Sequence, residues 1–363
     1  MPRRDGGRGA RSNLAGRYEP FQRSAVDDGW TVNDCEGSEE PPPPLRTSMT
    51  VERPKSIINY VDSPFVSFDR SINPYRGCEH GCIYCFARPT HAYYGLSPGL
   101  DFEQKLFAKP DAADLLRKEL SARKYKPAPI AIGTNTDPYQ PAERSYQIMR
   151  GILKVLTEFN HPVSILTKSA LIERDVDLLA PMAEKGLVKA MVSITSLDRY
   201  LSRTMEPRAS TPEKRLKAVT HLAQAGIPTG VMTAPVIPGL NDHEIEGLVE
   251  VIKQAGAQFA GYTIVRLPLE VAGLFQEWLE TAFPDRARRV LNHIRDMNGG
   301  RIYDPKWSRA EEPRSTVAKL IDQRFTAACR RHNLSTDIPI LNAAGFQRPV
   351  EKTPQLSLFS ESD

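Results

Sequence analysis

Residues 73–88 read Asn-Pro-Tyr-Arg-Gly-Cys-Glu-His-Gly-Cys-Ile-Tyr-Cys-Phe-Ala-Arg, and the expected fold is organised around this stretch. It places Cys78, Cys82 and Cys85 within eight residues, spaced C-x3-C-x2-C, with Tyr84 directly before the third cysteine. Thiolates this close on a short glycine-containing loop can converge on one iron–sulfur cluster, because such clusters select soft sulfur ligands. Three cysteines would leave one iron of a four-iron cluster open to a small chelating molecule.

Zinc is the main competing interpretation, with His80 or His91 joining the three cysteines, since zinc also binds thiolate and imidazole. The cysteines could instead form a redox disulfide or be unrelated residues of the core. Structural zinc sites usually pair two half-sites of the type C-x2-4-C or H-x3-5-H, and the sequence contains no second half-site. The spacing therefore favours the iron–sulfur cluster.

Composition indicates a globular enzyme. A chain of 363 residues with 40% hydrophobic content can form one large domain with appendages, or two domains. Its net charge of +4 is too small to predict a nucleic-acid partner by itself. There is no apolar run near the ~20 residues of a membrane span, and no secretory signal. Outside the motif only Cys35 and Cys329 remain, so we expect a cytoplasmic protein without a disulfide scaffold or a membrane partner.

The first 55 residues are expected to form a disordered tail. They are rich in arginine and glycine, then acidic, and then contain four prolines from Pro41 to Pro44. With so few apolar side chains, burial would not offset the loss of chain entropy on folding. The six arginines up to Arg23 could contact nucleic acid, but a solvated tail is the favoured interpretation.

From residue 65 onward, apolar strand candidates alternate with helical stretches. Strands are expected at residues 65–73, 129–134, 163–167, 188–194, 228–236 and 259–267. Helices are expected at residues 111–122, 143–159, 171–185, 212–225 and 242–255, with a kink or break at Pro181. Successive strand–helix units predict an α/β fold with a parallel sheet and crossover helices. Chemistry should gather where these strands end.

A basic helical extension is expected over residues 269–350, with helices at 271–283, 285–297 and 315–332. Between residues 285 and 331 there are twelve Lys or Arg against six acidic residues, with Tyr303, Trp307 and Phe325 interleaved. Cations with aromatic side chains are typical of a groove that holds a nucleic-acid strand. A basic helical face packed on the sheet is an equally good interpretation.

Polar side chains follow the expected strands. Asn135 lies in the turn 133–139 after the second strand, and Lys168 follows the third. Ser193 ends the fourth strand, and Arg208 comes shortly after it. Such groups can bind an amino group, a ribose or a carboxylate, for which an arginine fork is well suited. For any one of them ordinary turn chemistry is the alternative, but their recurrence at consecutive strand ends favours a shared site.

The cysteine spacing, with an aromatic residue before the third cysteine, resembles the signature of the radical S-adenosylmethionine (SAM) superfamily. Together with residues 134–139, 167–169 and 193–208, it resembles the spore photoproduct lyase-like, DNA repair photolyase-related branch over about residues 60–270. The resemblance implies a partial (β/α)6 TIM-like barrel over residues 56–268. It also implies a [4Fe–4S] cluster on Cys78, Cys82 and Cys85, and SAM contacts from Tyr84, Asn135, Lys168, Ser193 and Arg208.

By this resemblance the protein is a lyase-like radical SAM enzyme that takes electrons from a donor such as flavodoxin or ferredoxin. It would cleave SAM reductively to a 5′-deoxyadenosyl radical and abstract hydrogen from DNA or a modified nucleotide. The spore enzyme uses a cysteine near the end of its second strand as hydrogen donor, where this chain has Thr134-Asn135-Thr136. Cys329 is the catalytic candidate instead, which requires the C-terminal helices to fold over the mouth of the barrel, where the parallel strands end. The alternatives are radical chemistry on a protein, tRNA or small metabolite, and a non-catalytic metal-binding scaffold.

The flexible tail expected at residues 351–363 contains Gln355, Leu356, Ser357, Leu358 and Phe359. This segment resembles the short peptide by which bacterial DNA replication and repair proteins bind the sliding clamp. Two apolar anchors and a glutamine on a flexible tail are typical of peptide recognition in a pocket. A tail that folds back on the barrel is the alternative, because short motifs often match by chance.

Overall fold

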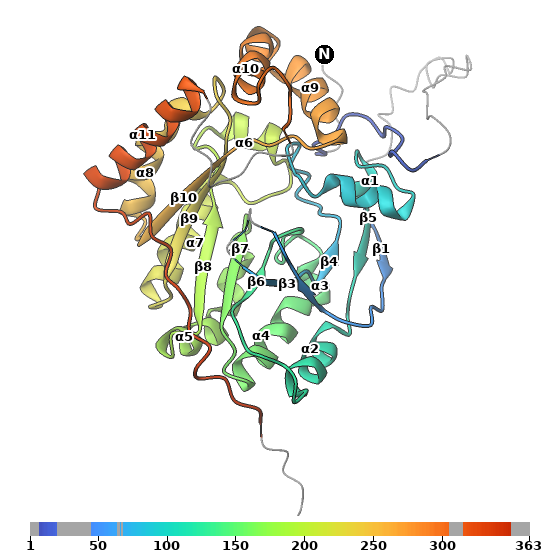
Figure 1. The fold of residues 1–363 in the computed structure, drawn as a ribbon, viewed down its shortest axis with the longest axis vertical. Coiled ribbons are helices and arrows are strands. Elements are labelled where there is room, and N and C mark those ends of the chain that lie inside the picture. The colour runs from blue at the N-terminus through green and yellow to red at the C-terminus, as the bar shows by residue number, and fades with distance from the viewer. Residues whose placement is uncertain (1–6, 20–44, 64–65, 67, 305–314, 350–363) are drawn as a thin grey trace, which may run out of the picture.

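A seven-stranded sheet forms the centre of the computed structural model, which describes residues 7–19, 45–63, 66, 68–304 and 315–349 (Figure 1). Its strand order is β10-β9-β8-β7-β6-β3-β2. All neighbours from β3 to β10 are parallel, and β2 pairs antiparallel at the edge. The strands are β2 (Ile58–Tyr60), β3 (Arg70–Ile72), β6 (Ile130–Ile132), β7 (Val163–Thr167), β8 (Val188–Ser193), β9 (Thr229–Val236) and β10 (Phe259–Ile264).

Helices connect the parallel strands as expected, which confirms the α/β class and is consistent with a partial (β/α)6 barrel. In α7, Thr211 caps the first turn by accepting a hydrogen bond from the Lys214 amide, and Pro212 occupies the first helical position. The connecting helices are α2 (Ala112–Ser121), α3 (Glu143–Tyr146), α4 (Ile148–Glu158), α5 (Val176–Glu184), α6 (Arg199–Met205), α7 (Pro212–Gln224) and α8 (Ile245–Gln254).

Two helical stretches differ from expectation because of buried carboxylates. The stretch 143–159 breaks at Gln147, which has φ 49°, and the Glu143 carboxylate caps α4 by accepting a hydrogen bond from the Met149 amide. In 171–185 the change from 3-10 to α geometry falls at Asp175, which accepts hydrogen bonds from Arg150 and Arg174. The helix α5 continues through Pro181, so the expected break there is wrong.

The expected disordered tail over residues 1–55 does not hold for the described parts of that segment. Residues 48–51 form strand β1, which pairs in parallel with β5 (Lys105–Ala108), and β5 pairs antiparallel with β4 (Tyr75–Arg76). Arg8 and Ala10 are buried against the rest of the chain. Hydrogen bonds from the amides of Gly9 and Ala10 to the buried Glu103 carboxylate replace the apolar contacts that this segment lacks. The remainder, residues 1–6 and 20–44 with Cys35, lies outside the described residues.

The C-terminal helices do not form one appendage. Helices α9 (Glu270–Ala282) and α10 (Pro284–Met297) lie at the end of the molecule to which the strands point (Figure 1). Helix α11 (Thr316–Arg331) instead packs on α8 and β10. The chain then returns to the start of β10, where the Ala260 amide donates to the Ser335 carbonyl over 2.8 Å. Trp307 and the clamp-like segment 355–359 lie outside the described residues, so the clamp interaction stays a prediction.

No helix in the described ranges is both long and apolar enough to cross a membrane.

At the end of the barrel where the strands begin, His161 anchors the C-terminal segment. Its Nδ1 donates to the Pro162 carbonyl over 3.0 Å, its Nε2 lies 2.7 Å from the Tyr125 hydroxyl, and its ring packs edge-on against Phe346. Burial lowers the pKa of His161 from 6.5 to about 4.

This buried histidine predicts a loss of stability in mild acid. Between pH 6.5 and 4 the unfolded chain binds a proton at residue 161 that the folded chain excludes, so the free energy of unfolding falls as pH falls. Chemical denaturation at pH 7 and pH 5 should show that His161→Gln removes about 2 kcal/mol of the wild-type decrease. The exposed His243→Gln should retain the full decrease, and an unchanged decrease in His161→Gln would refute this account.

Candidate functional site

The cysteine loop follows β3 and is folded by two tight turns. Gly77 and Gly81 have φ of 69° and 65°, a conformation that glycine adopts readily. The thiols of Cys78 and Cys82 are buried and that of Cys85 is half-buried, and no disulfide joins any of the four described cysteines. Burial raises the pKa of Cys82 to about 12 and that of Cys78 above its ordinary value, with the neighbouring thiols and carboxylates adding to the effect. The loop thus gathers three reduced thiols in one place.

A buried ion pair between Arg88 and Glu103 holds this loop in shape. The Arg88 guanidinium is fully buried and donates to the carbonyls of Gly81 and Cys82 over 3.0 and 2.9 Å. It also donates to the carbonyls of residues 98 and 99, and to the Glu103 carboxylate over 2.6 Å. Every nitrogen of the guanidinium is therefore used, and the backbone on either side of the second cysteine, Cys82, is fixed. The only sequence signal for this role was an arginine three positions after the last cysteine.

The N-terminal strap, defined here as residues 8–17, lies directly on the loop. The amides of Gly9 and Ala10 donate to the two oxygens of Glu103, both over 2.8 Å. A Cβ atom on Gly9 would stand 1.8 Å from the Gly81 carbonyl oxygen, so only glycine fits there. Further along, Ser12 donates to Glu277 of α9 over 2.6 Å. Sequence reasoning missed the strap because its polar composition is typical of disorder.

Tyr84 joins the loop to the ends of β7 and β8. Its hydroxyl donates to the buried Glu206, which also accepts hydrogen bonds from Thr195 over 3.0 Å and from the buried Arg215. Burial opposes ionisation of Glu206, but the charges of Arg215 and Lys168 hold its pKa below the ordinary value. Lys168 places its ammonium 5.8 Å from the centre of the Tyr84 ring.

Arg215 brings Ser193 into the same network by donating to the Ser193 carbonyl over 2.9 Å. The structure therefore brings Tyr84, Lys168 and Ser193 into one network. Neither Glu206 nor Arg215 was among the expected site residues. Their spacing of nine residues across a loop and a helix start gave no recognisable signal.

The turn after β6 is tied to the cysteine loop through Asp137. Its carboxylate accepts hydrogen bonds from the Thr167 hydroxyl and the Lys168 amide, both over 2.7 Å, and lies 3.3 Å from His80 Nδ1. Burial alone would raise the pKa of Asp137, but these contacts lower it to about 2. In the same turn the Asn135 amide donates to Asn73 Oδ1 over 3.0 Å, which leaves the Asn135 side chain exposed.

Arg208 contacts the cysteine loop at Glu79 and His80. Its Nη2 is 3.1 Å from Glu79 Oε1, and its amide donates to the His80 carbonyl over 3.3 Å. Its side chain is 34% exposed, so it can still reach another anion. Asn135 and Arg208 are thus placed at the margins of the network rather than within it.

Cys329 is not at this site. It is buried in the core formed by α11 with Ile321, Phe325 and Leu334, and its carbonyl accepts from the Leu334 amide over 2.9 Å. Ser335, which follows Leu334, pairs with Phe259 at the beginning of β10. The cysteine loop and α10 lie at the opposite end of the barrel, where the strands end. Burial raises the pKa of the Cys329 thiol to about 11. The expectation that α11 folds over the mouth, with Cys329 as the catalytic thiol, is therefore corrected.

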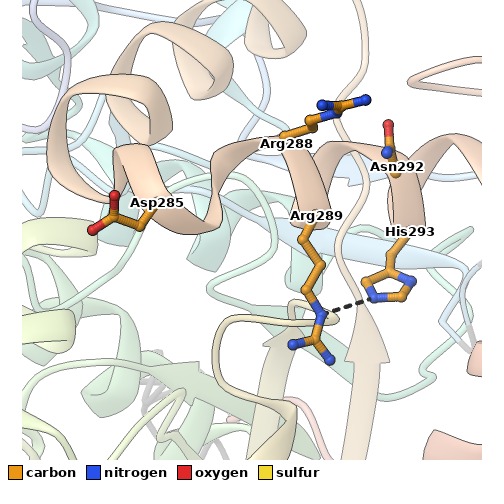
Figure 2. A pocket seen from close by; sticks show the side chains of 5 residues that line it. All are labelled: Asp285, Arg288, Arg289, Asn292 and His293. Carbon is orange, nitrogen blue, oxygen red and sulfur yellow. Dashed lines mark hydrogen bonds between the residues drawn. The ribbon is translucent and has the colours of Figure 1, made fainter.

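Helix α10, and not α11, lies over the ends of the strands, and it carries a basic surface. A Cβ atom on Gly239, just after β9, would stand 3.3 Å from His293 Cδ2, so α10 packs on this strand end. Figure 2 shows Arg289 and His293 extending from one side of α10, toward the strands, and Arg288 from the other. Arg289 Nε and His293 Nε2 are 3.5 Å apart. Together with Asp285 and Asn292, these side chains line an open hollow.

The Glu206–Arg215 pair yields a stability prediction. Glu206→Gln should lower the free energy of unfolding by about 3–5 kcal/mol, because Arg215, which is 1% exposed, would keep a buried charge without its counter-ion. Glu213→Gln is the matched control, since its pair with Arg199 is on the surface and should cost ~1 kcal/mol or less. Urea denaturation of both variants at pH 7 measures the difference. Equal losses would show that the buried pair contributes no more than a surface pair.

Comparison with known proteins gives relatives that match over most of their own length. The uncharacterized protein Rv2578c of Mycobacterium tuberculosis is 40% identical over 272 residues, which cover 74% of this chain and 78% of the relative. The uncharacterized protein MJ0683 of Methanocaldococcus jannaschii is 28% identical over 222 residues, covering 61% and 79% of the two chains.

Solved structures of spore photoproduct lyase have a similar fold. One variant has a TM-score of 0.53 at 18% identity, covering 78% of this chain and 79% of that one. Another, with bound AdoMet and dinucleoside spore photoproduct, has a TM-score of 0.51 at 15% identity and the same coverage. The family model of the Radical SAM superfamily matches residues 72–252, which include the cysteine loop, Lys168 and Arg215. The chain belongs to the radical SAM superfamily and is an enzyme of that class.

Proposed function

We propose that this enzyme binds a [4Fe–4S] cluster through Cys78, Cys82 and Cys85 and uses it with SAM to abstract hydrogen from DNA or a modified nucleotide. One observation carries the proposal. Three reduced thiols share a loop that is held by Arg88 and Glu103 and that meets the Tyr84–Lys168 network at the strand ends. When bound, the cluster supplies one electron that breaks the sulfur–C5′ bond of SAM, giving methionine and a 5′-deoxyadenosyl radical.

The ligand set fits a cluster better than a zinc ion. Within the described ranges, no three His, Cys, Asp or Glu side chains converge on a point that would hold a single metal ion. A cubane makes a different demand, because each thiolate binds a different iron. Among the described residues neither His80 nor His91 completes such a group with the cysteines. The His91 ring packs on Phe102, and its Nε2 donates to the Lys105 carbonyl over 2.9 Å.

The surrounding residues support binding of SAM beside the loop. Lys168 offers an ammonium for a carboxylate, and the buried Glu206 fixes the Tyr84 ring next to it. The exposed Asn135 side chain can donate to a ribose or accept from an amino group. Arg208 would have to share its guanidinium between Glu79 and SAM, so we assign it a weaker contact. Burial of Tyr84 and Ser193 keeps water away from the reacting end.

A nucleic-acid substrate is supported by the charge at the mouth. Arg286, Arg288 and Arg289 are exposed on α10, which packs on the end of β9. Cations in such a position can neutralise backbone phosphates. The spore photoproduct lyase structure with a dinucleoside photoproduct bound is compatible with a nucleotide entering a barrel of this kind. Because Cys329 is remote, the hydrogen-donor step of the spore enzyme is not part of this proposal.

The cluster assignment predicts the effect of removing a ligand. Cys82→Ala should lose the absorbance of the reconstituted iron–sulfur protein and the dithionite-dependent release of 5′-deoxyadenosine from SAM. Cys329→Ala, which removes a buried thiol at the other end of the barrel, should keep both. The measurements are an anaerobic absorption spectrum, iron content and chromatography of nucleosides. Retention of both signals in Cys82→Ala would end the assignment.

The N-terminal strap predicts that a distant residue controls cluster retention. Gly9→Ala would push the strap off the Gly81 carbonyl and expose the Arg88–Glu103 pair to water. We expect the cluster to be lost several-fold faster in air, with the thermal transition of the barrel nearly unchanged. Gly273→Ala in α9 is the control, because its added methyl group meets no atom within 4 Å. Equal bleaching rates for Gly9→Ala and the wild type would contradict this role.

The basic surface predicts salt-dependent DNA binding. Reversing Arg286, Arg288 and Arg289 to Glu should weaken binding and make the slope of log K against log salt shallower by up to ~3, one unit per phosphate contact. Reversing Lys319, Arg330 and Arg331, which are exposed on α11, makes the same change in net charge at another place. Fluorescence anisotropy with a labelled oligonucleotide compares the two triple variants. If both lose affinity equally, net charge and not the α10 surface is responsible.

A further inference from the structure

A second hollow lies beside the cysteine loop, and Arg208 is the one residue of its lining that was also assigned a contact to SAM. We propose that it binds a phosphate group, and that this is a backbone phosphodiester next to the nucleotide on which the enzyme acts. The phosphate site stands on geometry alone, whereas its nucleic-acid source rests on the proposed function. The hollow is lined by His80, Arg144, Ser169, Arg208, Ser210 and Lys214, among others.

Its size suits one phosphate group. The hollow has a volume of about 170 Å³. Pockets that enclose a drug-sized ligand are larger, at ~300–1,000 Å³. The hollow can therefore take a single tetrahedral anion with some water, while the rest of a larger molecule extends outside it.

Its charge is positive because two cations have no counter-ion among the described residues. Neither Arg144 nor Lys214 makes a side-chain hydrogen bond or ion pair with any part of the chain that the structure describes. Arg208 shares one carboxylate, Glu79, at 3.1 Å. The acidic neighbours in sequence are already engaged, since Glu143 pairs with Arg174 and Glu213 with Arg199. An anion would thus meet three cations, against the Glu79 carboxylate on Arg208 and the Asp137 carboxylate on His80.

The polar groups of the wall are hydrogen-bond donors. Ser169 Oγ accepts from the Leu171 amide over 3.2 Å, and Ser210 Oγ accepts from the Ala170 amide over 2.9 Å. Neither hydroxyl donates to a described residue, so each hydroxyl hydrogen is free to point into the hollow. The wall also includes Thr211, which caps the 13-residue helix α7, so the positive end of the helix dipole faces the same space. Phosphate oxygens, which only accept, match such a wall.

His80 connects the hollow to the cysteine loop. It is 2% exposed, and its imidazole lines the hollow. Its Nδ1 is 3.3 Å from Asp137 Oδ2 but at an angle that makes no hydrogen bond. This buried nitrogen therefore has no hydrogen-bond partner among the described residues. Because His80 lies between Cys78 and Cys82, a phosphate bound here would sit beside the radical-generating site and could position a substrate against it.

Binding measurements on the full-length protein test this assignment. A labelled single-stranded oligonucleotide should be displaced by inorganic phosphate, and the double variant Arg144→Gln, Lys214→Gln should bind the oligonucleotide about tenfold or more weakly. Lys217→Gln, one turn further along α7, removes an exposed charge outside the hollow and should bind like the wild type. An oligonucleotide with uncharged methylphosphonate linkages should bind weakly to all variants alike.

Several outcomes would overturn the proposal. One is a double variant that binds the oligonucleotide as tightly as Lys217→Gln. A second is inorganic phosphate binding without any effect on the oligonucleotide, which would indicate a free-phosphate site. A third is an equal loss of affinity for SAM in the double variant, which would place the hollow in the SAM site. Release of 5′-deoxyadenosine by the wild type is measured in parallel, so failure of the radical chemistry is distinguished from failure of the phosphate site.

Discussion

The buried pair of Arg88 and Glu103 is the constraint on which the site depends. A guanidinium without access to water must have every donor satisfied. Here the acceptors are two backbone carbonyls of the cysteine loop, the carbonyls of residues 98 and 99, and one carboxylate. That carboxylate in turn binds the amides of the N-terminal strap. Ser12 of the strap donates to Glu277 of α9, so loop, strap and α9 are held as one unit around the three thiols.

Much of the fold was predictable from the sequence because the parallel sheet is buried on both faces. The strand β7 lies at the expected residues 163–167, and the cap of α7 by Thr211 follows local rules. The cysteine motif and the grouping of Tyr84, Lys168 and Ser193 were also predictable, since spacing and strand-end position are properties of the local sequence. These are the features for which short-range information is sufficient.

The remaining features depend on contacts between distant residues. The strap was assigned to a disordered tail because its stability comes from one carboxylate about 95 residues away, which composition does not reveal. Cys329 was placed at the mouth because nothing in its sequence shows that α11 packs on α8 rather than on the strand ends. Glu206 and Arg215 were missed for the same reason. Buried charges are recognised only when their partners are known.

The central claim is that the loop holds a four-iron cluster with one iron open to SAM. Mössbauer spectroscopy of anaerobically reconstituted, 57Fe-labelled protein tests it most directly. The account predicts four irons per chain, one of which changes its signal when SAM is added while the other three, bound by Cys78, Cys82 and Cys85, do not. A spectrum in which SAM leaves every iron unchanged, or a preparation that binds zinc in place of iron, would contradict it.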